Sequence, residues 1–278
     1  MLRILIEKEK SNEQAKILGC LLKGIPQKFC ALSEDANCIL LKIGLPKSIR
    51  INRRRRLIRL INTAVEETVE YILTQVTADI AAKCVANVTK LNPNDQKAVE
   101  KEAVLQICKS NRSDAKRHVK ASWYSRIKRR VLKNMLESSV FAISAFIRFR
   151  INDYKEYVCR TVDHISQLKM NELKYFEFIS SLQHFVESRA CEIDEVVITV
   201  NDDSYSLTDS NGNAIDVSKY KNMLDKDIDK EDLLLSILLT MAPKTVTLNA
   251  DESFMDSDFF ASLVNIFGSG LKASYITK

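Results

Sequence analysis

The segment FIRFRINDY (146–154), followed by YFEFISSLQHFVESR (175–189), decides the fold of this chain. Both stretches combine aromatic residues with arginines that lie on or beside apolar positions repeating every three or four residues. This period is typical of amphipathic helices. We therefore predict one helix over 139–168 and a second helix over 172–189.

One charge in this segment is unusual, because a helix seldom places arginines among phenylalanines. On a continuous helix over 143–165, Arg150 lies at the margin of the apolar arc, near Phe146. A guanidinium cannot lose its charge, so Arg150 needs a carboxylate or several carbonyls nearby, and Asp153 is the local candidate. We interpret Arg150 and Asp153 as a structural buried charge that sets the register of two helices. The alternatives are an acidic partner from 172–189 and an anion site at a cleft. The structural interpretation predicts that Arg150→Ala strongly destabilises the protein.

Outward from this centre, the pattern predicts an α+β protein that is predominantly helical. A helical region (46–190) is flanked by a small N-terminal α/β piece (1–45) and a C-terminal α/β domain (191–278). The first piece contains the strand candidates LRILI and CILLKI, and the two flanking pieces are allowed to share one sheet. After Cys191 the apolar period changes to two, and the order of elements is ββαβαβ-like. The expected elements are a hairpin of EVVITV and SYSLTD, a tight turn at Asn211-Gly212, helices over 230–241 and 256–267, and strands over 244–249 and 271–276.

Charge is divided unequally along the chain. Residues 1–150 hold 30 Lys/Arg against 14 Asp/Glu, a net charge of +16, whereas residues 151–278 hold 12 against 22, a net charge of −10. The stretch 101–150 alone has 13 basic and three acidic residues. This asymmetry indicates either an anionic partner for the first half or docking of one half onto the other.

Two basic clusters are candidates for binding a polyanion such as nucleic acid. Four consecutive arginines (Arg53, Arg54, Arg55 and Arg56) precede the first long helix, where they oppose the positive end of the helix dipole. A second cluster forms one stripe of a helix and consists of Arg126, Arg129, Arg130 and Lys133. A solvated helix start is the alternative for the first cluster. For the stripe we favour an ordinary amphipathic helix whose wet face docks on the acidic C-terminal half.

Cysteine and histidine patterns indicate neither a metal site nor a catalytic centre. The seven cysteines (20, 30, 38, 84, 108, 159 and 191) are scattered without a CxxC pair, so we expect no disulfide and no bound metal. The three histidines lie far apart in the sequence, and His184 falls on the polar side of its helix. We identify no catalytic residues and no cofactor, and we expect a non-enzyme.

The chain shows no membrane-spanning segment. No uncharged run approaches the roughly 18 residues that a membrane helix requires. Charged residues also interrupt the apolar run of MLRILIEKEK at once, which is not the pattern of a signal peptide. We therefore expect a cytoplasmic protein.

At FIRFRINDYKEYVCRTVD (146–163) and YFEFISSLQHFVESR the chain resembles the YtxC-like family of sporulation proteins from endospore-forming bacteria. The resemblance extends from Arg117 to the end of the chain, including the turn at 209–213 and the passage LLLSILLTMAPKTVTL, whereas residues 1–110 match more loosely. It implies a cytoplasmic bacterial protein linked to spore formation, and it carries no catalytic residue over to this chain.

The expected function is therefore that of a sporulation-associated protein that binds a protein partner or itself. The first alternative is nucleic-acid binding by the basic region 50–133. The second is an enzyme of unrecognised type, with its site at the carboxyl ends of the strands in the last domain.

Overall fold

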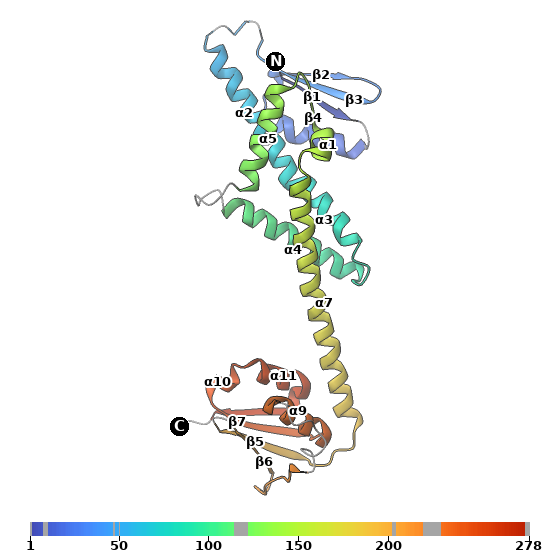
Figure 1. The fold of residues 1–278 in the computed structure, drawn as a ribbon, viewed down its shortest axis with the longest axis vertical. Coiled ribbons are helices and arrows are strands. Elements are labelled where there is room, and N and C mark those ends of the chain that lie inside the picture. The colour runs from blue at the N-terminus through green and yellow to red at the C-terminus, as the bar shows by residue number, and fades with distance from the viewer. Residues whose placement is uncertain are drawn as a thin grey trace. The chain divides into compact units, whose positions relative to one another are not determined.

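The computed structural model describes residues 2–7, 11–46, 48–49, 51–113, 122–201, 204–218 and 229–275. The chain divides into two compact units, residues 1–170 and 171–278 (Figure 1). Helices predominate in the described residues, and each unit contains a small mixed sheet. The predicted class, a predominantly helical α+β protein, is confirmed.

The sheet of the first unit has the strand order β2-β3-β1-β4. Its strands are β1 (Leu2–Glu7), β2 (Cys30–Glu34), β3 (Cys38–Ile43) and β4 (Phe141–Ala142). The first three strands pair antiparallel, whereas β4 pairs parallel to β1. Alternate residues of β1 and β3 are buried, as the period-two pattern predicts. Because β4 comes from 141–142, this sheet joins the N-terminal strands to the central helical segment.

Helices make up the remainder of the first unit. They are α1 (Ser11–Lys23), the 3₁₀ turn η1 (Gln27–Phe29), α2 (Arg53–Tyr71), the π-helical turn η2 (Ile72–Val76), α3 (Thr77–Ala86), α4 (Pro93–Ser113), α5 (Trp123–Glu137), α6 (Ile143–Phe149) and the first part of α7 (Asn152–Ser188). Val65 and Val69 of α2 and Val76 of η2 are buried in the core of this unit. The stripe Ile127, Val131 and Met135 buries one side of α5.

The central helix is interrupted where the sequence suggested continuity. α6 ends at Phe149, and the Arg150 N–H donates to the Phe146 carbonyl at 2.8 Å. α7 begins at Asn152, a residue type that favours helix starts over helix interiors. Farther along, the two helices predicted over 139–168 and 172–189 prove to be largely one helix, α7, of 37 residues.

The second unit has the strand order β6-β5-β7-β8. After the end of α7 it contains β5 (Glu195–Asn201), β6 (Ser204–Asp209), α9 (Lys230–Met241), β7 (Thr245–Ala250), α10 (Glu252–Met255), α11 (Asp258–Phe267), the 3₁₀ turn η3 (Gly268–Gly270) and β8 (Leu271–Tyr275). β5 and β6 pair antiparallel, and β5, β7 and β8 pair parallel. Figure 1 shows α9 and α11 on the same side of this sheet. Their apolar residues, among them Leu238 and Leu263, pack with Ile198 and Leu248 in one core.

Two predictions about the second unit can be compared directly with the structure. The order ββαβαβ is confirmed. The turn at Asn211-Gly212 is also present, with Gly212 at φ +82° and the Asp209 carboxylate accepting from the Asn211 and Asn213 N–H groups. By contrast, the described strands of the N-terminal and C-terminal pieces do not share one sheet, an arrangement that the sequence left open. The described strands make two separate sheets, because β1 pairs with β4 and β5 pairs with β7.

Candidate interaction groove

A groove lies between the second half of α5, the helix α6 and the start of α7, all within the first unit. It consists of two hollows of about 480 and 450 Å³ that share Asn134, Phe146, Phe149 and Arg150. The first hollow is also lined by Arg130, Lys133, Glu137, Asn152 and Asp153, and the second by Val140, Ala142 and Ala145. Five residues of the segment 146–154 line this groove: Phe146, Phe149, Arg150, Asn152 and Asp153.

The break between α6 and α7 gives the groove its exposed residues. Phe149 is the last residue of α6. It lines the first hollow and is 67% exposed, which is unusual for an aromatic residue. Phe146, one turn earlier, is buried and contacts Phe141 with ring centroids 5.3 Å apart. One phenylalanine thus anchors α6 to the core, while the other remains available at the surface.

Arg130 and Asp153 form the strongest polar contact in the groove. The two guanidinium nitrogens of Arg130 donate to the two carboxylate oxygens of Asp153, each at 2.7 Å. Arg130 also donates to the Arg150 carbonyl at 3.1 Å, which joins α5 to the turn between α6 and α7. This bidentate geometry is the one that arginine and carboxylate prefer.

The pKa values of both groups shift in the directions expected for an ion pair. Hydrogen bonding to Arg130 lowers the pKa of Asp153, and the bond to Asp153 raises the pKa of Arg130. Because the pKa of Asp153 is lowered on folding, the pair stabilises the protein above the unfolded pKa of the carboxyl. This stabilisation is lost as the pH falls through the lowered pKa. Both side chains are more than a third exposed, so solvent screening limits the contribution to roughly 0.2–1 kcal/mol.

The predicted buried charge Arg150–Asp153 is wrong. Arg150 is exposed, no described carboxylate pairs with its guanidinium, and Asp153 pairs with Arg130 instead. The reason is the helix break, because the arc assumed for a continuous helix over 143–165 does not exist at Arg150. The large destabilisation expected for Arg150→Ala therefore loses its basis, and exposed substitutions of this kind change stability by at most about 0.5 kcal/mol.

The basic stripe of α5 divides into paired and unpaired residues. Lys133 lies 3.9 Å from Glu137, and both of these side chains are well exposed. Arg126 is exposed and stacks over the Trp123 ring at 5.0 Å, and Arg129 is exposed. The described acidic partners of the stripe, Asp153 and Glu137, both belong to the first unit.

The four arginines at the start of α2 do not line the groove. Arg53 donates to the Leu45 carbonyl at 3.3 Å and so holds the connection that leads into its helix. Arg54, Arg55 and Arg56 are exposed on the first turn of α2. Part of the predicted nucleic-acid region 50–133, namely Arg50 and residues 114–121, lies outside the described residues.

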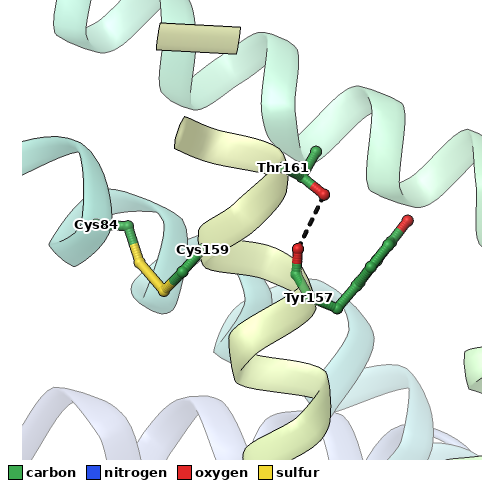
Figure 2. Close-up of a disulfide and its surroundings, with 4 residues drawn as sticks. All are labelled: Cys84, Tyr157, Cys159 and Thr161. Atoms are coloured by element: carbon green, nitrogen blue, oxygen red, sulfur yellow. Dashed lines mark hydrogen bonds between the residues drawn. A yellow bond between two sulfur atoms is a disulfide. The ribbon is translucent and has the colours of Figure 1, made fainter. Parts of the chain in front are cut away.

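The expectation that no cysteine forms a disulfide is wrong. Figure 2 shows Cys84 of α3 joined to Cys159 of α7, with the two Cα atoms 5.7 Å apart. The other five cysteines are free. The two partners are 75 positions apart in the sequence, and only the packing of α3 against α7 brings them together. No spacing rule for local motifs could have identified this pair.

In the part of the chain that the structure describes, no group of three or more His, Cys, Asp or Glu residues could hold a metal ion. At the carboxyl end of β7, Asp251 accepts from the Phe254 N–H at 3.0 Å and thereby caps α10. His184 is exposed. Among the described helices, none combines the length and the apolar character that crossing a membrane requires.

Sequence reasoning found the groove's segment but assigned the wrong roles within it. It overlooked Phe149 as an exposed residue and the pairing of Arg130 with Asp153. A signal was present in FIRFR (146–150), where aromatic and basic residues are so close together that they cannot all lie on one buried face of a helix.

The fold and the groove define a predominantly helical α+β protein of two units. A model of the YtxC-like family matches residues 59–272, and the chain therefore belongs to the YtxC-like family. The matched range begins within α2 and ends within β8, so it contains the whole groove. Comparisons with curated proteins and with solved structures gave no significant match.

Proposed function

We propose that this YtxC-like protein is a cytoplasmic, sporulation-associated protein that acts by binding a protein partner through the groove of α5, α6 and α7, rather than by catalysis. The sporulation setting rests on the resemblance to the family. The binding role rests mainly on one observation, the 67% exposed Phe149 ring beside Arg150 in a hollow of about 480 Å³.

The composition of the groove favours a protein partner over nucleic acid. Aromatic residues and arginines are enriched at the centres of protein interfaces, and both line this groove. Glu137 and Asp153 also line it, and Asp153 already neutralises Arg130, which would weaken attraction to a phosphate backbone. A partner that covers Phe149 gains about 25 cal/mol for each Å² of apolar surface removed from water.

A variant that places two acidic side chains in the groove tests this proposal. We expect Phe149→Asp/Arg150→Glu to keep the wild-type melting temperature, because both side chains are exposed, and to abolish capture of specific partners from sporulating cells. The matched control is Leu105→Asp/Lys109→Glu on α4, which also replaces one apolar and one basic side chain by acidic ones on another exposed surface. The measurement is quantitative affinity purification with the tagged full chain, followed by direct binding of the purified partner.

The outcomes of this experiment are distinct. Loss of the partner in the groove variant alone supports the proposal, and capture of a second copy of this chain identifies self-association. Equal capture by wild type, groove variant and control would show that the groove is not the binding site.

A second candidate, polyanion binding, is favoured by the exposed arginines outside the groove. Arg54, Arg55, Arg56, Arg126 and Arg129 are exposed, and no acidic partner is described for them. If they bind nucleic acid, the affinity for a labelled oligonucleotide should fall linearly with salt on a log–log scale, as counterions are released. Replacing Arg54, Arg55 and Arg56 by Gln should reduce that slope, and no binding at low salt removes this candidate.

A further inference from the structure

The helix α6 also lines a second cavity, which shares no residue with the groove. This cavity measures about 260 Å³, and three cations line it: Lys83 from α3, Arg148 from α6 and Lys155 from α7. The hydroxyl-bearing Ser144 of α6 lines it as well, together with Val76, the last residue of the π-helical turn. Turns of this rare type occur frequently at functional sites.

The electrostatic environment of the cavity is positive at Lys155. This lysine is half-buried, and its Nζ donates to the Arg148 carbonyl at 3.1 Å and to Asn152 Oδ1 at 3.4 Å, both neutral oxygens. Burial lowers the pKa of Lys155, and repulsion from Lys83 and then from Arg148 lowers it further. Glu7 and Asp79 line the same cavity, yet neither contributes to this shift.

Two crosslinks hold the helices that carry these lysines. The Cys84–Cys159 disulfide joins α3 to α7, and the buried hydroxyls of Thr77 and Tyr154 join the same helices at 2.6 Å. Cys84 follows Lys83 directly, and Cys159 lies one helical turn after Lys155 (Figure 2 shows the disulfide). The two ammonium groups are thus carried by fixed backbones, and a bound anion would relieve a repulsion that the fold maintains.

We propose that this cavity binds a phosphate group, either as inorganic phosphate or as the phosphoryl end of a small metabolite. Lysine and arginine supply charged donors to phosphate oxygens, and Ser144 supplies a neutral donor. The volume lies just below the roughly 300–1,000 Å³ typical of sites for drug-sized ligands, which matches a small anion.

Calorimetric titration of the 278-residue chain with inorganic phosphate tests this site, with sodium chloride holding the ionic strength constant. We expect saturable binding that Lys155→Met and Lys83→Met each weaken about tenfold or more, since each removes a charged hydrogen-bond donor. Lys174→Met, an exposed position on the same helix α7, is the matched control and should bind as wild type does. A parallel titration with glycerol phosphate distinguishes the sources, because tighter binding of the ester indicates a metabolite and tighter binding of the ion indicates phosphate itself.

A second readout separates ligand binding from a structural role. The pKa of Lys155, followed by NMR of its side chain, should rise when phosphate is added, because a bound anion stabilises the charged ammonium. If Lys155→Met does not fold, the exposed Lys83→Met decides the question. Three results would overturn the proposal: chloride binds as tightly as phosphate, the pKa of Lys155 does not change when phosphate is added, or Lys83→Met binds phosphate with the wild-type affinity.

Discussion

Tyr154→Ala is expected to lower the free energy of unfolding of the first unit by about 3–5 kcal/mol, as large-to-small changes of buried aromatic residues do. The Tyr154 side chain is fully buried at the start of α7, and its ring contacts Trp123 of α5 with centroids 5.3 Å apart. Its hydroxyl bonds to the Thr77 hydroxyl, which itself donates to the Ile72 carbonyl across the π-helical turn. One side chain therefore holds α5, α3 and the irregular turn against α7. Urea denaturation followed by circular dichroism measures the loss.

Two further variants separate the contributions of Tyr154. Tyr154→Phe keeps the ring and removes the hydroxyl, so we expect a smaller loss of about 1–3 kcal/mol, because the buried Thr77 hydroxyl loses one of its two hydrogen-bond partners and keeps only the Ile72 carbonyl. Tyr275→Ala, which removes a ring that is 72% exposed, should change stability by at most about 0.5 kcal/mol. If the free energy of unfolding of Tyr154→Ala lies within about 1 kcal/mol of the wild-type value, Tyr154 does not hold these helices together.

Removal of the disulfide is expected to have an effect of similar size. The Cys84–Cys159 bond closes a loop over 75 residues of sequence separation, for which chain entropy gives a stabilisation of about 4 kcal/mol. Cys84→Ser and Cys159→Ser should each lose most of this stabilisation, measured by urea denaturation without a reducing agent. Addition of a reducing agent should cause a comparable loss of stability in the wild-type protein.

Thiol counting gives an independent check on the disulfide. Under denaturing, non-reducing conditions five of the seven cysteines should react with a maleimide, because two are joined. Cys191→Ser is the matched control, since Cys191 is free and exposed, and it should leave stability unchanged. Seven reactive thiols, or a Cys84→Ser protein as stable as wild type, would contradict the pairing.

The short helix α6 explains how one segment can serve two surfaces. Phe146 and Phe149 of this helix line the groove, whereas Ser144, Ile147 and Arg148 line the second cavity of about 260 Å³. The helix ends immediately afterwards, and the turn at Arg150 accepts a hydrogen bond from Arg130. Arg148 and Arg150, two residues apart, therefore contribute to different sites.

Elements that depend on local patterning could be predicted from the sequence. The change of period from 3.6 to two after Cys191 indicated the ββαβαβ order, because each period describes which side chains share a face within one element. The turn at Gly212 was predictable for a similar reason, since glycine adopts φ +82° without a steric cost. The burial of Ile127, Val131 and Met135 likewise follows from their spacing on one helix.

Tertiary structure alone decided which distant residues meet. Cys84 pairs with Cys159, Arg130 pairs with Asp153, and β4 joins the sheet beside β1, although each partner is far away in the sequence. The expectation that Arg150 lies near a buried face failed because α6 ends at Phe149 and α7 begins at Asn152, so no single helix carries the apolar arc assumed for 143–165. Sequence period thus determines which face of an element is apolar, whereas the partner of that face depends on the long-range contacts that folding brings together.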